Sequence, residues 1–432
     1  MGGTMEGYSN QACAPFVKDP AMIKIHPFEA ERPPRELSGS VASVPYDVIS
    51  TNEARTLAEG NEHSFLHVVR PEIDLPVETG AYEDAVYAMA RTNLDRFRES
   101  GVIARDLEPG IYLYRLTWRG RSQTGIVCCC DAQQYREGLV KKHEFTRPDK
   151  EDDRTRHLQV TEAHAEPVFL AFHDDERIAE LVRGDLESSP YCSFEAEDDV
   201  VHECWKVNDP GAYVRAFQNL DALYIADGHH RSAAAERTAT ALMNQNPAHT
   251  GDESYNHLLA VCFPSSELRI LPYNRVVNDL AGMDKAEFLE RLTSIGTLRP
   301  TEDPTPSGRG VVCVHLDGSW HELRFDPARI DASDPVESLD CALLQSLVLE
   351  PMLDIDDPRT NSRIQFVGGI RGLDELAEKA GTSGVAFSMH PTSMEELLSV
   401  ADSGMTMPPK STWFEPKLRS GLFVHDFSGS TS

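Results

Sequence analysis

The sequence predicts a mixed α/β fold, and three observations support that prediction. Apolar runs of strand length alternate with helical segments along most of the 432 residues. Residues 82–100 carry apolar side chains at helical spacing, which predicts a long amphipathic helix. Residues 110–118 and 125–130 are apolar runs separated by a polar turn, which predicts a hairpin. Hairpins mixed with strand–helix units are typical of α/β or α+β proteins.

Further elements are expected along the chain. A first strand is predicted at residues 22–28, and Ser50 followed by Glu53 has the pattern of a capping box for a helix over 53–59. The other expected strands are residues 167–172, 222–226, 258–263, 268–271, 364–367, 385–388 and 421–424. The other expected helices are residues 155–166, 231–243, 340–349, 373–380 and 394–403, and residues 284–330 read as a helix followed by strands.

Composition divides the chain into three parts. Residues 1–20 are small and polar and are expected to be a disordered tail. Residues 21–300 form a first α/β region, and residues 301–432 form a second. The stretch 300–310, rich in Pro, Thr and Gly, reads as a surface loop or a boundary between them.

The overall charge excludes one class of function. The chain has 41 Lys and Arg against 70 Asp and Glu, a formal net charge of −29. Nucleic-acid binding relies on basic surface, so we expect no nucleic-acid partner, although a local basic pocket for a small anion remains open. No apolar run approaches 18 residues, and residues 1–10 show no basic region followed by an apolar core, so we expect a cytoplasmic protein without a membrane span. Nothing in the sequence indicates the oligomeric state.

The chain has nine cysteines, and their arrangement is consistent with the expected cytoplasmic location. Cys128, Cys129 and Cys130 are consecutive in an apolar run, and adjacent residues of a strand point to opposite faces. A tetrahedral metal site shared by all three is therefore awkward, and buried free thiols are expected.

The most informative segment is the apolar run 222–226 followed by Asp227-Gly-His-His-Arg231 and an alanine-rich stretch. This pattern predicts a strand, a tight turn and a helix. A helix start exposes unpaired N–H groups and the positive end of the helix dipole. Two histidines and an arginine at that point therefore predict a phosphate-binding site. The plainer alternative is that Asp227 caps the helix and the histidines face solvent.

Three other segments carry residues suited to chemistry. The charged run 141–154 contains His143, Glu144 and Arg147, and a histidine beside a carboxylate suits acid–base work, although such a run is usually a solvated face. The segment Met407-Pro-Pro-Lys-Ser-Thr412 has a lysine followed by two hydroxyl side chains, a combination that can bind a phosphate or carboxylate. A proline turn without any binding role would have the same sequence pattern. The segment 44–49, together with 70–74, could line a cleft.

A metal held by the protein is a further alternative. The possible ligands are Asp227, His229, His230, His143 and His257. No compact His-Glu-x-x-His spacing occurs, so we expect no protein-held metal and favour Mg²⁺ brought by a nucleotide.

Several motifs together resemble a known family. They are Val44-Pro-Tyr-Asp-Val48, Ser64-Phe-Leu-His-Val68, Arg70-Pro-Glu-Ile-Asp-Leu-Pro76, Asp227-Gly-His-His-Arg231 and Met407-Pro-Pro-Lys-Ser-Thr412. In this order they resemble the family called domain of unknown function 1015, from about Ile23 to the C-terminus. Locally, over 222–240, the chain also resembles free-serine kinases of the ParB/sulfiredoxin-like fold. The resemblance implies a ParB/sulfiredoxin-like nucleotide-binding core over 21–300 with large α/β elaborations, and a region 301–432 that completes the pocket.

The resemblance also implies roles for residues of the turn. It places Gly228, His229, His230 and Arg231 on nucleotide phosphates and Asp227 near the reacting centre. The glutamate base of such kinases has no matching position, so Glu144 is a candidate base from its local chemistry alone, with His143 beside it. The candidate substrate-binding residues are Tyr46, Asp47, Arg147, Lys410, Ser411 and Thr412.

These observations lead to one functional hypothesis with alternatives. The chain is expected to be a phosphotransferase that uses ADP or ATP with Mg²⁺ to phosphorylate free serine or a similar hydroxy amino acid. This reaction would be part of serine metabolism. The alternatives are a phosphoserine-type phosphatase, a metal-dependent hydrolase, or a nucleotide-binding regulatory protein without turnover.

Overall fold

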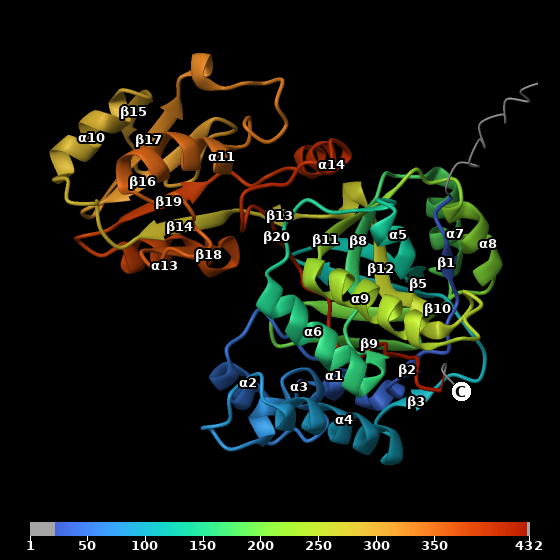
Figure 1. Cartoon of the computed structure of the whole chain (residues 1–432). Helices are drawn as coiled ribbons and strands as arrows, with labels where there is room; N and C mark the ends of the chain where they lie inside the picture. Colours follow the sequence, from blue (N-terminus) through green and yellow to red (C-terminus); the bar gives the residue numbers. More distant parts are fainter. Residues whose placement is uncertain (1–21, 430–432) are drawn as a thin grey trace, which may run out of the picture.

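The structure is a computed structural model that describes residues 22–429. The tail predicted at residues 1–20 lies outside the described residues. The described chain contains two large sheets flanked by helices, which confirms the predicted mixed α/β fold class (Figure 1).

The first sheet has nine strands within the described range and is mixed in direction. In spatial order the path is β6 (Val140–Lys141), β11 (Leu223–Asp227), β8 (Val168–Phe172), β12 (His257–Pro264), β5 (Arg121–Asp131), β4 (Tyr112–Trp118), β10 (Val201–Lys206) and β9 (Cys192–Glu195), with β1 (Ile25–His26) beside β5. The predicted hairpin is β4–β5. Its turn residues Arg119 and Gly120 have φ of 51° and 73°, as the right-handed twist of a two-residue hairpin requires.

The two faces of the first sheet are covered differently. One face packs against α7 (Glu176–Asp185), α8 (Pro210–Phe217) and α9 (His229–Gln245), so Leu170 and Phe172 of β8 lie in a core with side chains from these helices. On the opposite face, Phe169 lies in a core with Phe414 and Phe423 from near the C-terminus. The C-terminal segment is therefore part of the first lobe.

A group of helices packs at the lower edge of the first lobe (Figure 1). The group comprises α1 (Ser38–Val41), α2 (Thr51–Ala58), α3 (Leu66–Val69) and α4 (Asp84–Glu99), while α5 (Ala132–Arg136) and α6 (Pro148–Thr161) lie against α9. The capping box predicted from Ser50 and Glu53 is present at α2. The helix predicted at 155–166 is corrected to α6, because Pro148 at the first turn, followed by acidic residues, favours an earlier start.

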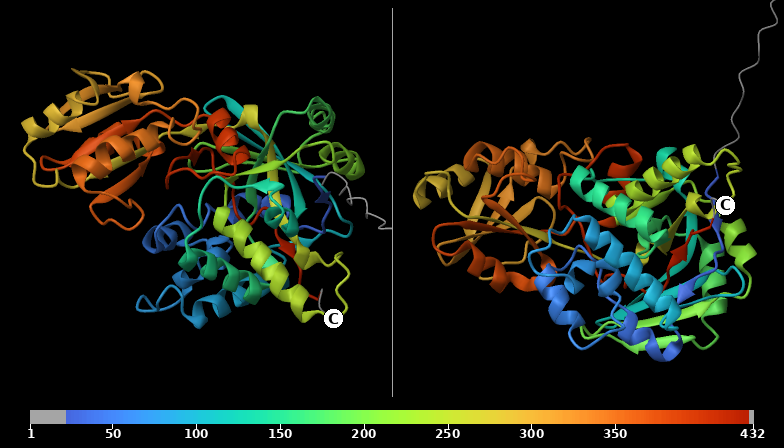
Figure 2. Two further views of the ribbon diagram at one scale, coloured as in Figure 1. Left: turned by 45° about the horizontal axis from the view of Figure 1, so that its top comes forward. Right: turned by 60° about the horizontal axis from the view of Figure 1, so that its bottom comes forward.

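The second sheet forms a lobe of its own (Figures 1 and 2). Its order is β15 (Gly296–Pro300), β17 (Ser319–Phe325), β16 (Val311–Leu316), β19 (Val385–Met389), β14 (Tyr273–Val277) and β18 (Ile364–Gly368), with α10 (Lys285–Thr293), α11 (Asp340–Leu344), α12 (Glu350–Leu353), α13 (Gly372–Ala380) and α14 (Met394–Asp402) also in this part of the chain. The strands thus change sheet near residue 272, not near 300. The 300–310 loop joins β15 to β16 inside one sheet, because β17 pairs with both strands.

After α14 the chain returns to the first lobe. Strand β20 (Trp413–Phe414) pairs with β13 (Ile270–Leu271), and β21 (His425–Asp426) pairs with β7 (Ala163–His164). The prediction of a strand at residues 421–424 is wrong. In this stretch only Val424 pairs with another strand residue, in an isolated antiparallel bridge to Glu31. Gly421 interrupts the predicted strand, since its φ of 85° is not a strand conformation and its α-carbon packs directly onto Phe65.

Two other expectations can be compared with the described residues. The eight cysteines that they include are all free and buried, as predicted. Between residues 22 and 429, no helix has the length and apolar character needed to cross a bilayer.

Candidate functional site

The Asp-Gly-His-His-Arg turn lies where strand β11 ends and helix α9 begins. Strand β11 runs to Asp227, Gly228 is the N-cap residue and α9 starts at His229, which confirms the predicted strand, turn and helix. Gly228 has a φ of 99°, a conformation that favours glycine, and a side chain there would press on the Arg231 guanidinium. The turn therefore requires glycine.

Asp227 is held in an ion pair and does not cap α9. Helix α9 has no side-chain cap, and Asp227 Oδ2 instead accepts a hydrogen bond from Lys417 Nζ at 2.8 Å. Arg231 Nη2 lies 3.7 Å from Asp227 Oδ1. Burial acts to raise the pKa of Asp227, but the charges of Lys417 and Arg231 outweigh it and hold the pKa well below its usual range. Asp227 is thus a permanent carboxylate that organises cations.

His229 and His230 hold the 143–147 segment against the start of α9. His229 Nε2 accepts from the backbone N–H of His143 at 3.5 Å, and His230 Nε2 accepts from the backbone N–H of Arg147 at 3.0 Å. Burial lowers the pKa of both histidines, so they are neutral acceptors. This pairing brings the charged run to the turn.

Arg231 lies behind the turn. Its side chain is buried, and Nη1 donates to the backbone carbonyl of Pro167. It lines a small internal space together with Arg154 and Glu166. Among the described residues, its Nε has no hydrogen-bond partner. Arg231 consequently places positive charge beneath Asp227.

Glu144 and His143 are neighbours in the chain but differ in their surroundings. His143 is buried, its ring centroid lies 4.5 Å from that of His229, and its Nε2 lies 3.4 Å from Thr412 Oγ1. Burial lowers the pKa of His143 to about 4. Glu144 is half-buried, and burial raises its pKa against the opposing charge of Lys410. Of the two, Glu144 is the group whose pKa moves in the direction that strengthens it as a proton acceptor.

Two distant loops complete the site. The backbone N–H of Met407 donates to the His143 carbonyl at 2.8 Å, which fixes the 407–412 loop beside Glu144. On the other side, Arg70 Nη1 donates to the Tyr46 carbonyl at 2.6 Å, and the Arg154 guanidinium lies 3.9 Å from the centre of the Tyr46 ring. The segments 44–49 and 70–74 therefore form one wall, as the sequence suggested they could.

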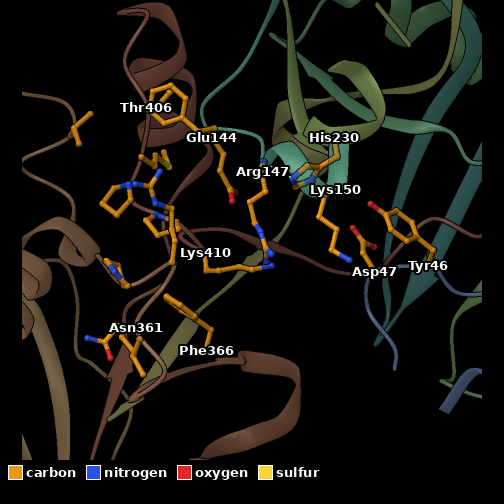
Figure 3. Close-up of a pocket in the computed structure, with 18 of the residues that line it drawn as sticks. Tyr46, Asp47, Glu144, Arg147, Lys150, His230, Asn361, Phe366, Thr406 and Lys410 are labelled. Carbon is orange, nitrogen blue, oxygen red and sulfur yellow. Dashed lines mark hydrogen bonds between the residues drawn. The ribbon is translucent and has the colours of Figure 1, made fainter. Parts of the chain in front are cut away.

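A cavity of about 680 Å³ lies between these loops and the second lobe (Figure 3). Its lining includes five Lys or Arg side chains but only two carboxylates. Those cations are Arg70, Arg147, Lys150, Arg359 and Lys410, and the carboxylates are Asp47 and Glu144. Figure 3 shows Glu144, Arg147, Lys150 and Lys410 pointing into the same space. A cavity lined mainly by cationic side chains, in a chain of net charge −29, favours an anionic ligand.

A smaller cavity of about 250 Å³ adjoins the first. Asp47, Glu144 and Lys410 line both cavities, and the smaller one also reaches Asp227 and Lys417. The ion pair of the turn thus faces the same continuous space as Glu144.

The structure brings together most of the predicted site residues. Those that line one or both cavities are Tyr46, Asp47, Glu144, Arg147, Asp227, His229, His230, Lys410 and Thr412. His143, Gly228 and Arg231 lie directly behind them. Ser411 points elsewhere, because its hydroxyl donates to the Pro408 carbonyl at 2.6 Å and lies 3.1 Å from Cys341 Sγ.

Sequence reasoning missed several cavity residues. Lys417 lies alone between Pro416 and Leu418, and no motif around it signals a role. Lys150 belongs to the charged run, which read as surface, whereas Arg359 and Phe366 come from the second lobe. Only the three-dimensional arrangement reveals these four residues.

The fold and the cavity define a mixed α/β protein with a basic cleft between two lobes. A family model described as "Protein of unknown function (DUF1015)" matches residues 25–342, so the chain belongs to this family. No curated protein matches the chain.

Solved structures show low similarity. The chain is similar to SbnI with C-terminal truncation from Staphylococcus aureus, at 11% identity and a TM-score of 0.37, over 68% of this chain and 85% of that one. It is also similar to a free serine kinase in complex with AMP, at 13% identity and a TM-score of 0.35, over 70% and 91%. A conserved hypothetical protein from Pyrococcus furiosus is 13% identical with a TM-score of 0.34, over 69% and 94%. At these TM-scores the likenesses carry no argument about this chain's activity.

Proposed function

We propose that this chain is a small-molecule phosphotransferase that moves a phosphoryl group from ADP or ATP to the hydroxyl of free serine or a similar hydroxy amino acid. The observation that carries the proposal is the basic cavity with Glu144 inside it. The choice of serine rests on the resemblance of the Asp-Gly-His-His-Arg turn to free-serine kinases.

The cavity offers groups for both ends of a nucleotide. Lys410, Arg147 and Lys150 point into one space and would neutralise phosphate oxygens, which is the main demand of phosphoryl transfer. Burial acts to lower the pKa of Lys410, but Tyr273 and Glu144 outweigh it and raise the pKa, so the ammonium stays charged. Ile364 and Phe366, apolar side chains of the second lobe, line the same cavity and could pack against the nucleobase of the nucleotide.

Glu144 is the group that would activate the acceptor. The acceptor oxygen forms a bond to the terminal phosphorus, the bond from that phosphorus to the rest of the nucleotide breaks, and the hydroxyl proton moves to Glu144. A raised pKa makes a carboxylate a better proton acceptor at neutral pH. Asp227 is less suited to this role, because Lys417 holds its pKa low.

Asp47 fits the Mg²⁺ that a nucleotide would bring. Its side chain is exposed to the cavity, and between residues 22 and 429 no group forms a hydrogen bond or ion pair with it. A free carboxylate is what Mg²⁺ bound to phosphates takes from a protein. When bound, the ion would supply charge neutralisation, and Asp47 would orient it.

The test follows phosphorus directly. Purified chain is incubated with Mg²⁺, serine and either ADP or ATP, and ³¹P NMR monitors O-phosphoserine. We expect product from the wild type and from a Glu137→Gln surface control, and a rate lower by about a hundredfold to ten-thousandfold from Glu144→Gln with nucleotide binding retained. Nucleotide binding without product from any hydroxy amino acid would instead identify a regulatory protein.

A second candidate is a metal-dependent phosphoester hydrolase, which one observation favours. The donor atoms of His143, Glu144 and His229 all lie within 4.8 Å of one another. This function predicts zinc or iron by elemental analysis, and release of phosphate from O-phosphoserine without nucleotide. Neither result is expected of the phosphotransferase.

A further inference from the structure

A second cluster of metal-ligating side chains lies at the end of strand β5. His26 comes from β1, Asp131 ends β5 and His257 begins β12. One donor atom from each residue lies within 4.8 Å of the other two. None of the three lines either cavity of the candidate functional site.

The strand register explains why the three side chains meet. His257 lies directly opposite Asp131, and His26 lies opposite Cys129, two residues before Asp131. Residues two apart in a strand share a face, so all three side chains project from one face of the sheet. Three adjacent backbones thereby fix the spacing of the donors.

The donor distances are close to those of a metal site. Asp131 Oδ1 lies 2.7 Å from His26 Nε2 and 3.7 Å from His257 Nε2. Two ligands at roughly 2 Å from a tetrahedral ion lie about 3.3 Å apart, so small side-chain rotations suffice. The two imidazole rings stack with centroids 4.1 Å apart.

Access from solvent distinguishes this cluster from the other donors of the first sheet. The His26 side chain is 33% exposed and that of Asp131 is 20% exposed, so an ion can enter. Cys128, Cys130 and Cys262 also converge, but each is fully buried among apolar residues. His425 stands near His257, but its Nε2 is already hydrogen-bonded to the Ser254 carbonyl, so it is not counted among the ligands.

We propose that His26, Asp131 and His257 bind a divalent transition metal, with Zn²⁺ as the best match to two imidazoles and one carboxylate. The ion would join β1 to β5 and β12 and so anchor the first strand of the lobe. The proposal is independent of the phosphotransferase function.

The test uses the full chain after removal of metal by a chelator. Zn²⁺ binding is measured by titration calorimetry, and Co²⁺ binding by the visible absorption that reports its geometry. We expect His26→Gln and Asp131→Asn each to lose one equivalent of metal, or to bind it at least about tenfold more weakly. Zn²⁺ should raise the Tm of the wild type but not that of these variants.

Two controls separate this site from others. His249→Gln disrupts another partly exposed histidine–carboxylate pair, His249 with Glu253, and should bind metal like the wild type. His143→Gln removes a donor from the group of His143, Glu144 and His229, and this variant should still bind the one metal ion that we assign to the His26 cluster. Equal metal binding by the wild type, His26→Gln and Asp131→Asn, each folded by circular dichroism, would overturn the proposal, as would loss of the equivalent only in His143→Gln.

Discussion

Lys417 Nζ lies 2.8 Å from Asp227 Oδ2, and this ion pair joins residues 190 positions apart in the chain. The pair connects the turn before α9 to the segment that returns from the second lobe. Both side chains are largely shielded, with exposed fractions of 15% and 22%. Each charge therefore depends on the other for much of its compensation, and Arg231 is a second, more distant partner of Asp227.

Replacing Lys417 by Met should destabilise the fold. Breaking a buried pair costs about 3–5 kcal/mol, and the lower end applies here because Arg231, 3.7 Å from Asp227, still compensates part of its charge. We expect a loss of this size in the free energy of unfolding, measured by urea denaturation. The double variant with Asp227→Asn should recover part of the loss. Lys379→Met, which removes an exposed partner of Glu375, should cost less than about 1 kcal/mol.

Asp227 should also affect the acid stability of the protein. Its folded-state pKa is held below the unfolded value, so its contribution is fully present above the unfolded pKa of about 4 and is lost as pH falls through the folded pKa. The difference in stability between wild type and Asp227→Asn should shrink steadily below about pH 4. A difference that stays constant from pH 6 to pH 2 would contradict this role of the ion pair.

Turnover should have an acidic limb set by Glu144. The base must be deprotonated, and burial raises the pKa of Glu144, so kcat should fall as pH drops through a value above that of a free glutamate. The measurement is the pH dependence of O-phosphoserine formation. Lys410→Met should move this limb to higher pH, since Lys410 opposes the raised pKa.

Lys410 should also contribute to nucleotide affinity. A hydrogen bond to a charged group contributes about 1.5–3 kcal/mol, so Lys410→Met should raise KM for nucleotide by at least about tenfold. The wild type should lose affinity with rising salt more steeply than the variant. Lys285→Met, which changes a lysine of the second lobe outside both cavities, should leave KM unchanged.

The capping box of α2 offers a test of local stability. Ser50 accepts from the Glu53 N–H, and the Glu53 side chain accepts from the Ser50 N–H. Ser50→Ala should cost about 1 kcal/mol in the free energy of unfolding. Thr56→Ala in the same helix should cost less, because alanine favours a helix interior.

Local chemistry made much of the fold predictable. Asp227-Gly228 marks the change from strand to helix, Ser50 and Glu53 mark the start of α2, and the polar turn before residue 125 marks a hairpin. Each signal lies within a few residues of the structure that it specifies. Such signals are absent at the return from α14, where the chain pairs with strands formed 140 or more residues earlier.

The candidate site divides in the same way. Asp227, His230 and Glu144 were found because they cluster in sequence near other chemical groups. Lys417 and Arg359 were not found, since their roles come from the meeting of two lobes. Ser411 shows the converse: it adjoins Lys410 in sequence, but its hydroxyl turns back to the Pro408 carbonyl.

The late return of the chain determines when the protein can work during its synthesis. A ribosome that has made residues 1–400 has made every strand of both large sheets. The nascent chain still lacks Lys410, Thr412 and Lys417, and with Lys417 the nearest cationic partner of Asp227. The basic cleft therefore assembles only once residues 407–417 are made, and a product that stops near residue 400 would lack both the site and the part of the first lobe's core that Phe414 and Phe423 supply.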